Sequence, residues 1–343
     1  MSARPGRLGV GVVGAGRVGA VLGSALRAVG HAVVGVSAIS QASLERAETL
    51  LPGVPVLEVA DVVERAELVL LAVPDDALAD LVAGLAGTGA WQPGQLVVHT
   101  SGRYGVEVLA PARAQGAIPL AIHPAMTFTG TSLDLARLEG TTFAVTSPAP
   151  VQPIGQALVV ELGGEPVVVA EEARGLYHAA LAHGANHLVV LVAQAAQALA
   201  AAGVAQPGRA LSPLLAAALD GAVRAADAAS PGLGAFADPT GAVPGARAPG
   251  GGAPGDGVPG DDVPEPSGPG AIAALTGPVS RGDVGTVVEH LRAFEDLAAR
   301  AGATDLPSSY RELSRDAARR ALAVGRITDH QAEQLLDVLE EGQ

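Results

Sequence analysis

The hydrophobic positions in the first half of the chain form short apolar runs that alternate with stretches of helical spacing. The apolar runs predict strands at residues 8–13, 32–36, 54–57, 68–73, 96–99, 118–122, 142–145 and 166–169. The intervening patterns predict helices at residues 17–29, 41–51, 75–85, 105–115 and 154–162. Strands that are apolar throughout and joined by helices are typical of a parallel sheet covered on both faces. We therefore expect a doubly wound α/β domain over residues 1–170.

Strand patterns stop after residue 170, and the rest of the chain has helical periodicity. Helices are predicted at residues 173–202, 207–229, 283–301, 306–323 and 329–340, which gives an all-helical domain over residues 171–343. Residues 231–270 interrupt it with 9 prolines and 12 glycines. Such a segment cannot bury enough apolar surface to fold, so it predicts a disordered insertion.

Composition and charge exclude several classes of function. The net charge of −14 disfavours nucleic-acid binding, and no apolar run reaches the length of a membrane span. The first apolar run, residues 8–13, is too short for a signal peptide, so we expect a cytoplasmic protein. The chain has no Cys, and all 21 of its basic side chains are Arg. Thiolate chemistry, Cys-ligated zinc and lysine Schiff bases are therefore excluded, and a proton donor must be His, Tyr, Asp or Glu.

A glycine-rich turn joins the first predicted strand to the first predicted helix. It consists of Gly14, Ala15, Gly16, Arg17, Val18 and Gly19. In such a turn the first glycine permits a tight bend, the second lets the backbone approach a pyrophosphate, and the third allows close helix–strand packing. The helix N-terminus adds free N–H groups and a positive dipole. The turn therefore predicts dinucleotide binding in a Rossmann-type domain.

The end of the second strand bears on the choice of dinucleotide. NAD sites usually place an acid there for the ribose 2′-hydroxyl, but this chain has Ser37 and Ser40, and no acid before Glu45. A serine hydroxyl can donate to a 2′-phosphate, and Arg17 can add positive charge. We therefore predict NADP rather than NAD. Val73 and Pro74, which end the fourth predicted strand, are expected beside the cofactor, with Asp75 capping the next helix.

Two histidines end predicted strands, at the edge where doubly wound sheets place their sites. His123 is interpreted as functional, with a pKa near neutrality that would let it both give and take a proton. His99, close to Ser101, is either a substrate ligand or a buried histidine with satisfied hydrogen bonds.

Further candidates lie in the helical domain. His178 and Asn186 share a helix face and are expected to orient a substrate. His183 and His187 have the spacing of metal ligands, but no third ligand is evident and no metal is predicted. Thr276 and Arg281 follow the insertion, and Thr276 is expected to contact the substrate. Arg281 is either a clamp for a substrate carboxylate or a solvated residue before a helix that Asp283 caps.

These segments together carry a family resemblance. They are the glycine turn, Val73-Pro74-Asp75-Asp76, His99-Thr100-Ser101-Gly102, His123-Pro124, Leu176-Tyr177-His178 with Asn186, Leu275-Thr276-Gly277-Pro278 and Arg281-Gly282-Asp283. The chain resembles predicted NAD(P)-dependent oxidoreductases that join a Rossmann-like domain to a helical domain of unknown function. It is more distantly similar to prephenate dehydrogenases, pyrroline-carboxylate reductases, ketopantoate reductases and 3-hydroxyacid dehydrogenases.

The distant resemblances imply different catalytic residues. That to prephenate dehydrogenases implies His123 as the catalytic histidine with Ser101 as its support. Ketopantoate reductases and 3-hydroxyacid dehydrogenases use a Lys four residues before an Asn; Asn186 matches the Asn, but Ala182 stands in place of the Lys.

Two functions remain open at this point. The first is hydride transfer between NADP(H) and a small carboxylate-bearing carbonyl, alcohol or imine, such as a 2-oxo acid. In it, His123 acts as general acid and base, His178 and Asn186 orient the substrate, and Arg281 holds its carboxylate. The alternative is a non-catalytic module that senses NADP(H). The alanine-rich helices are apolar over most of their surface, which favours a homodimer.

Overall fold

The computed structural model describes residues 7–228 and 270–340, so the predicted insertion lies outside the described residues except for Gly270. The chain divides into two compact units, Met1–His187 and Leu188–Gln343. The division falls within the long helix α8 (Arg174–Ala201), and each unit is described by itself.

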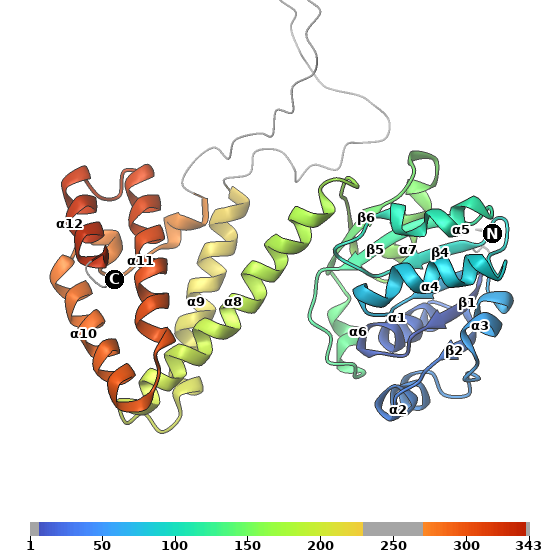
Figure 1. The fold of residues 1–343 in the computed structure, drawn as a ribbon, viewed down its shortest axis with the longest axis horizontal. Helices are drawn as coiled ribbons and strands as arrows, with labels where there is room; N and C mark the ends of the chain where they lie inside the picture. Colours follow the sequence, from blue (N-terminus) through green and yellow to red (C-terminus); the bar gives the residue numbers. More distant parts are fainter. Residues whose placement is uncertain (1–6, 229–269, 341–343) are drawn as a thin grey trace, which may run out of the picture. The chain divides into compact units, whose positions relative to one another are not determined.

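The first unit is built on a seven-stranded sheet with the order β2-β1-β3-β4-β5-β6-β7 (Figure 1). Its strands are β1 (Gly9–Val13), β2 (Ala32–Ser37), β3 (Leu68–Leu71), β4 (Leu96–His99), β5 (Ile118–Pro124), β6 (Thr142–Thr146) and β7 (Glu165–Val168). All neighbours pair in parallel except β5 and β6, which are antiparallel. This pair departs from the expected parallel sheet, because an unbroken apolar run indicates burial on both faces and carries no information on strand direction.

Helices cover both faces of this sheet, as the sequence predicted. One face packs against α1 (Arg17–Ala28), α2 (Gln41–Leu50), α6 (Leu133–Arg137) and α7 (Gln152–Glu161). The other packs against α3 (Val59–Arg65), α4 (Asp75–Gly87), the 3₁₀ turn η1 (Val106–Leu109) and α5 (Ala110–Ala114). A further 3₁₀ turn, η2 (Ala149–Val151), precedes α7.

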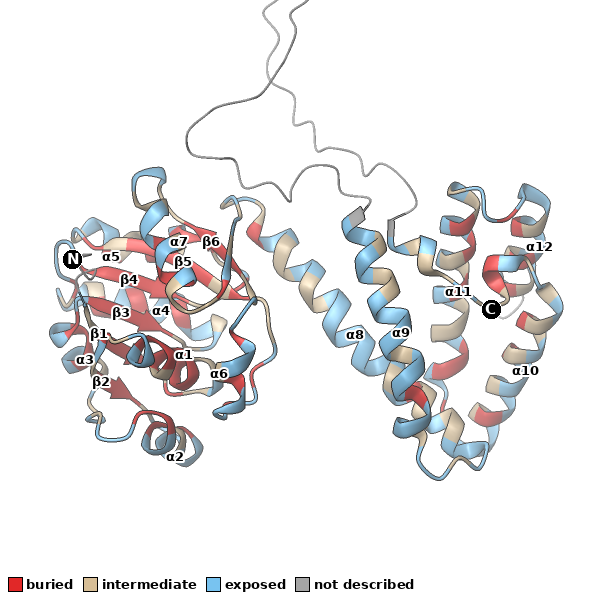
Figure 2. Ribbon diagram, turned by 180° about the vertical axis from the view of Figure 1, so that it is seen from behind, coloured by how far each residue is buried: buried red, intermediate tan, exposed pale blue. Residues whose placement is uncertain are grey.

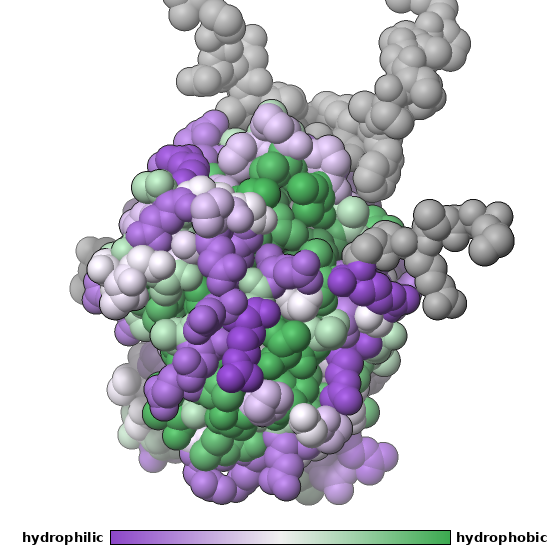
Figure 3. Space-filling model, turned by 90° about the vertical axis from the view of Figure 1, so that its right-hand side faces the viewer, coloured by the Kyte–Doolittle hydropathy of each residue, from purple (hydrophilic) through white to green (hydrophobic). Residues whose placement is uncertain are grey.

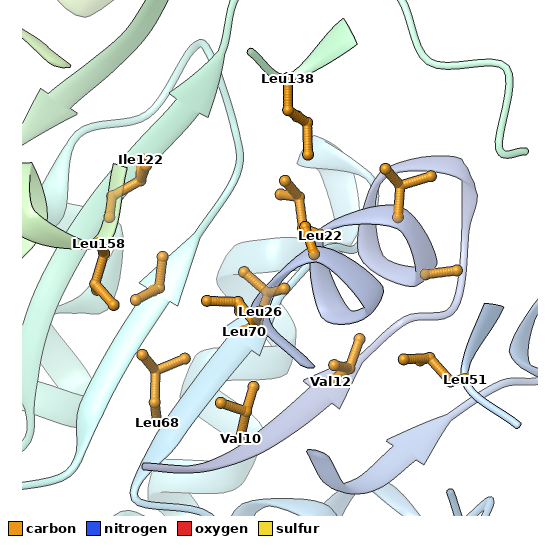
Figure 4. Packing of buried hydrophobic residues seen from close by; sticks show 14 of the residues in the cluster. Val10, Val12, Leu22, Leu26, Leu51, Leu68, Leu70, Ile122, Leu138 and Leu158 are labelled. Carbon is orange, nitrogen blue, oxygen red and sulfur yellow. The ribbon is translucent and has the colours of Figure 1, made fainter. Parts of the chain in front are cut away.

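The two cores are formed by alternate residues of the same strands. Val12, Leu70 and Val98 point into the core shown in Figure 4, whereas Val13 and Leu71 point into the opposite core. Successive side chains of a strand point to opposite faces, so a strand buried on both faces needs apolar residues throughout. This requirement explains why the strands could be located from the sequence.

One predicted strand does not form. Residues 54–57 contribute only an isolated bridge between Val36 and Val56. Gly53 has a φ of 78°, which turns the chain, and Pro55 has no N–H to donate to a neighbouring strand. Helix α3, which the sequence analysis did not predict, follows this segment.

The second unit is helical. It contains the second half of α8, then α9 (Pro207–Ala228), the 3₁₀ turns η3 (Gly270–Ala274) and η4 (Val279–Arg281), α10 (Val284–Ala301), α11 (Asp305–Ala323) and α12 (Asp329–Glu340). Buried aliphatic residues such as Val287, Ala318 and Leu335 join α10, α11 and α12 into a core. Asp283 caps α10 by accepting from the backbone N–H of Thr286 at 3.1 Å.

Helix α8 is exposed along most of its length. By length and composition alone it could cross a membrane, because its most apolar 18-residue window has a mean hydropathy of 1.3. Only 6% of that window is buried within the protein. Figure 2 shows α8 and α9 mostly exposed, in contrast to the buried strands of the first unit. The face of the first unit seen in Figure 3 instead intersperses its apolar areas with hydrophilic side chains.

Candidate cofactor and catalytic site

Of the three glycines in the turn between β1 and α1, only the second borders open space. Gly14 has a φ of 96°, and a Cβ there would lie 2.6 Å from the carbonyl oxygen of Ala72. A Cβ on Gly19 would lie 2.0 Å from the carbonyl oxygen of Gly14, so helix and turn touch through this position. Nothing lies within 4 Å of a Cβ on Gly16, which is the N-cap of α1 and forms no side-chain cap. The open backbone and the free N–H groups at the helix start fit a pyrophosphate.

The two serines after β2 have structural roles. Ser37 is buried, and its Oγ accepts from the backbone N–H of Gly14 at 3.0 Å, so it holds the glycine turn. Ser40 is exposed and caps α2 by accepting from the N–H of Ser43 at 3.2 Å. Their predicted contacts with a 2′-phosphate stay a prediction, and Ser37 has little surface for one.

A pair of arginines lies close to the turn. A Cβ on Gly130 would be 2.7 Å from Cγ of Arg17 and 3.0 Å from Nε of Arg46, so both side chains border the same loop. Within residues 7–228 and 270–340, neither arginine forms an ion pair with a carboxylate. Two adjacent unpaired cations favour an anion. Sequence reasoning missed Arg46 because only the tertiary fold brings α2 beside this loop.

The turn shares one cavity of about 430 Å³ with two of the predicted histidines, His123 and His178. Its lining consists of Gly16, Arg17, Val18, Ala72, Val73, Pro74, Asp75, Thr100, Ser101, Gly102, His123 and His178. The predicted capping role of Asp75 is wrong: Pro74 occupies the cap position and Asp75 is the first residue of α4, facing the cavity. Residues from the carboxyl ends of β3, β4 and β5 meet here because parallel strands end at one edge of the sheet.

His123 lies near the end of β5 and contacts the first turns of α8. Its Nδ1 is 2.9 Å from the hydroxyl of Tyr177, and its ring centre is 6.2 Å from that of His178. Burial, with further contributions from the charges of Arg174 and His178, lowers the pKa of His123 to about 4. The expected near-neutral pKa is therefore wrong: the ring is neutral at pH 7, with Nε2 left to serve the cavity.

Gly102 lies against both histidine rings. A Cβ at this position would be 2.8 Å from Cδ2 of His178 and 2.9 Å from Nε2 of His123. Only glycine therefore allows both rings their observed places.

His99 and Ser101 support the loop after β4. His99 is fully buried; its Nδ1 accepts from the N–H of Ser101 at 3.2 Å, and its Nε2 donates to the carbonyl of Gly105 at 2.8 Å. It is therefore a buried histidine with both nitrogens satisfied, and the interpretation as a substrate ligand is corrected. Burial lowers its pKa to about 4.

Ser101, which the resemblance to prephenate dehydrogenases implies as the support of His123, forms its side-chain hydrogen bonds within its own loop. Its Oγ accepts from the N–H groups of Arg103 and Tyr104, each at 3.2 Å, which shapes the loop although Ser101 still lines the cavity. Tyr177 contacts Nδ1 of His123 instead.

Arg174, at the start of α8, is a buried cation that sequence reasoning missed. It is 1% exposed and donates to Oγ1 of Thr146 at 2.7 Å and to the carbonyl oxygens of Ala121 at 2.8 Å and Ala144 at 3.1 Å. Burial lowers its pKa to about 10, so it stays charged at pH 7. The guanidinium thereby joins α8 to β5 and β6 and sets a positive charge behind His123.

The remaining predicted residues lie outside the cavity lining. Asn186 is exposed on α8, two helical turns beyond His178, and does not line this cavity. Thr276 lines a separate, mostly apolar cavity of about 360 Å³ in the second unit, and Arg281 is exposed in η4. Their roles toward a substrate stay predictions.

His183 and His187 contact one another through their Nδ1 atoms at 2.9 Å. Across the described ranges, no three His, Cys, Asp or Glu side chains are grouped as a metal site requires.

Comparison with solved structures supports the fold. The chain is 21% identical to a candidate NADP oxidoreductase from Bacteroides fragilis, with a TM-score of 0.63 over 91% of this chain and 98% of that one. An imine reductase from Pseudomonas sp. is 19% identical, with a TM-score of 0.60 over 97% of this chain and 100% of the other. A protein from Thermotoga maritima is 19% identical, with a TM-score of 0.56 over 90% and 98%. No curated protein is significantly similar to the chain.

Family models match most of the sequence. Residues 1–124 match the Rossmann-like domain, and residues 141–233 and 267–317 match a domain of unknown function, DUF2520. The first match contains the glycine turn and His123, and the second contains α8 and the Leu275-Thr276-Gly277-Pro278 segment. The resemblance inferred from the sequence is confirmed, and the chain belongs to the family that joins a Rossmann-like domain to a DUF2520 domain.

Proposed function

We propose that this protein is an NADP-dependent oxidoreductase that transfers a hydride between the nicotinamide and a small carboxylate-bearing carbonyl, alcohol or imine. One observation carries the proposal: a single cavity combines the open glycine turn with His123 and His178. A module that only senses a dinucleotide would need the turn but no histidines beside it. The similar folds named as an NADP oxidoreductase and an imine reductase agree with this class of chemistry.

NADP is favoured over NAD by charge. Arg17 and Arg46 border the same loop at Gly130, and the segment that follows β2 has no acid before Glu45 to accept from a ribose 2′-hydroxyl. An arginine pair can bind a 2′-phosphate through charge-assisted hydrogen bonds. Titration with NADPH and NADH tests this. Arg46→Gln should weaken NADPH at least about tenfold and leave NADH unchanged, since a lost charged hydrogen bond costs about 1.5–3 kcal/mol. Arg65→Gln is the control for charge, and tighter binding of NADH would contradict the proposal.

The chemistry assigned to the chain is proton transfer. The nicotinamide, when bound, supplies or accepts the hydride. Nε2 of His123 then donates a proton to the substrate oxygen or nitrogen, or takes it back in the opposite direction. A neutral imidazole can do this at pH 7 because one ring nitrogen carries a proton and the other can accept one. His178 lines the same cavity and is placed to orient the substrate.

A turnover screen tests the function. NADPH oxidation is followed with 2-oxo acids, including ketopantoate, and with cyclic imines. His123→Ala should reduce kcat about 100-fold or more, the usual contribution of a general acid or base. His330→Ala, which changes an exposed histidine of α12, serves as the control. NADPH binding without turnover on any of these substrates would favour the sensing module, and full activity of His123→Ala would remove the role of that residue.

We also propose that the protein is a cytoplasmic homodimer in which a second copy covers α8. Leu176, Val189 and Val190 are 77%, 68% and 49% exposed, and Leu214 of α9 is 66% exposed. A bilayer is a poor occupant, because Arg174 is buried in the first unit and Gln194 donates to Asp305 at 2.7 Å in the second. These contacts tie both ends of α8 to folded units.

Light scattering after size exclusion should give twice the chain mass, and Val189→Glu with Val190→Glu should give monomers. Association with the membrane fraction, or a monomeric wild type, would contradict the dimer.

A further inference from the structure

Tyr177 is the only hydrogen-bonding partner of the His123 ring within the described residues. The hydroxyl lies 2.9 Å from Nδ1, and the two rings meet edge to face with centres 5.6 Å apart. Tyr177 lies on the first turn of α8, three residues after Arg174, whose guanidinium carbon is 5.9 Å from the tyrosine ring centre. The contact therefore links the candidate proton donor to a buried cation through a phenol.

We propose that Tyr177 is a positioning residue that donates its hydroxyl proton to Nδ1 of His123 and so keeps the ring proton on Nε2. This assignment rests on the proposed function, because Nε2 is the nitrogen that would serve the substrate. A Cβ on Gly102, which lines the cavity, would lie 2.9 Å from Nε2, so this nitrogen borders the cavity. The tautomer decides whether the cavity meets an N–H donor or a bare acceptor.

Hydrogen-bond satisfaction within the protein favours Tyr177 as the donor. If Nδ1 of His123 donated to Tyr177, the phenolic proton of this half-buried residue would find no acceptor among the described residues and would depend on solvent. With Tyr177 as donor, its proton is bound, and the Nε2 proton points to the cavity where a substrate can accept it. Burial also raises the pKa of Tyr177 and keeps its hydroxyl protonated at neutral pH.

His99 shows the same arrangement with a different donor. The N–H of Ser101 donates to Nδ1 of His99, which leaves Nε2 as the donor to the carbonyl of Gly105. Both histidines that end strands at this edge are thus held at Nδ1. They differ at Nε2: this nitrogen of His99 donates to the carbonyl of Gly105, whereas that of His123 faces the cavity.

In the reducing direction the protons balance as a two-step relay. As the substrate carbon receives the hydride from NADPH, the C=O or C=N electron pair takes the proton from Nε2 of His123. The O–H bond of Tyr177 breaks, and its proton passes to Nδ1. The phenolate charge is stabilised by Arg174 until solvent returns a proton to Tyr177. The reverse reaction runs the same transfers backwards.

Imidazole NMR on the full-length protein with NADP⁺ tests the tautomer without requiring turnover. Nitrogen-15 spectra at pH 7, with His123→Gln used to assign the resonance, should show Nε2 of His123 protonated and Nδ1 accepting. In Tyr177→Phe both tautomers should be populated. Tyr310→Phe is the matched control, since the Tyr310 hydroxyl is also 2.9 Å from Nδ1 of a histidine, His290. A protonated Nδ1 in the wild type, or a His123 signal unchanged by Tyr177→Phe, would overturn the proposal.

Kinetics provide a second readout once a substrate is identified. Tyr177→Phe should lower kcat about 10- to 100-fold with KM little changed, and the pH profile of kcat should shift. The groups around His123 are Tyr177, Arg174 and His178 on α8, with His99 on β4 and Asp75 on α4. Tyr177→Phe removes the phenolic hydroxyl and leaves the other titratable groups around His123 unchanged, so a shift of the pH profile would come from the loss of that hydroxyl. If both Tyr177→Phe and Tyr310→Phe lower Tm equally but only Tyr177→Phe changes the pH profile, Tyr177 positions His123 and does not merely stabilise the fold. If no substrate is turned over, the proposed function fails while the NMR result still decides the tautomer.

Discussion

Gly102→Ala places one methyl group against both histidines of the candidate site. The new Cβ would lie 2.8 Å from Cδ2 of His178 and 2.9 Å from Nε2 of His123, whereas nonbonded carbon atoms approach to about 3.5 Å or more. Each ring must therefore move by roughly 0.7 Å. The φ of Gly102 is not left-handed, so alanine adds no backbone strain of its own.

The displaced atoms are ends of side chains that border a cavity, so the free energy of unfolding should change little, by less than about 1 kcal/mol. Catalysis should respond strongly, because a misplacement of about 1 Å can cost about 100-fold in rate. We expect kcat for NADPH oxidation to fall about 30- to 100-fold, with the Kd for NADPH unchanged.

The assay combines steady-state kinetics, NADPH titration and urea unfolding of the full-length protein. Gly84→Ala is the matched control: Gly84 lies in α4, nothing is within 4 Å of its Cβ position, and alanine should stabilise the helix. Wild-type kcat in Gly102→Ala would refute the reasoning that the observed positions of His123 and His178 serve catalysis.

Three further predictions concern stability. Arg174→Met should lower the free energy of unfolding by about 3 kcal/mol in urea titrations, because buried acceptors lose a charged donor, and Arg174→Lys should not restore it; a loss below 1 kcal/mol would contradict this. Burial lowers the pKa of His99 from 6.5 to about 4, so the unfolded chain binds the proton first as pH falls. Stability should thus drop between pH 6.5 and pH 4, by about 3 kcal/mol for this group. An unchanged pH slope in His99→Gln would disprove that origin. Asp134→Ala should cost about 3 kcal/mol, because its carboxylate accepts from the N–H groups of Thr129 and Gly130, each at 2.8 Å; a thermal scan with an unchanged Tm would count against it.

The sequence by itself determined the elements that depend on local rules. Strands buried on both faces must be apolar throughout, so most of the sheet could be located from its apolar runs. The glycine turn was also recognisable, because Gly14 needs a positive φ and Gly19 touches the carbonyl of Gly14. These are constraints within a few residues of chain or within one repeating pattern.

The tertiary structure decided which residues share a site and what each one does there. His99 and His123 have the same local surroundings in sequence, each at the end of a buried strand. They differ because the N–H of Ser101 and the carbonyl of Gly105 satisfy both nitrogens of His99, whereas Tyr177, 54 residues away, binds only Nδ1 of His123.

The places of Arg46, Arg174 and Asn186 were likewise set by packing. Helix α2 brings Arg46 to the loop of Gly130, and the start of α8 buries Arg174 against β5 and β6 while Asn186 stays exposed. Charge, burial and hydrogen bonding at these positions depend on neighbours from distant parts of the chain. A one-dimensional pattern of polar and apolar residues does not contain that information.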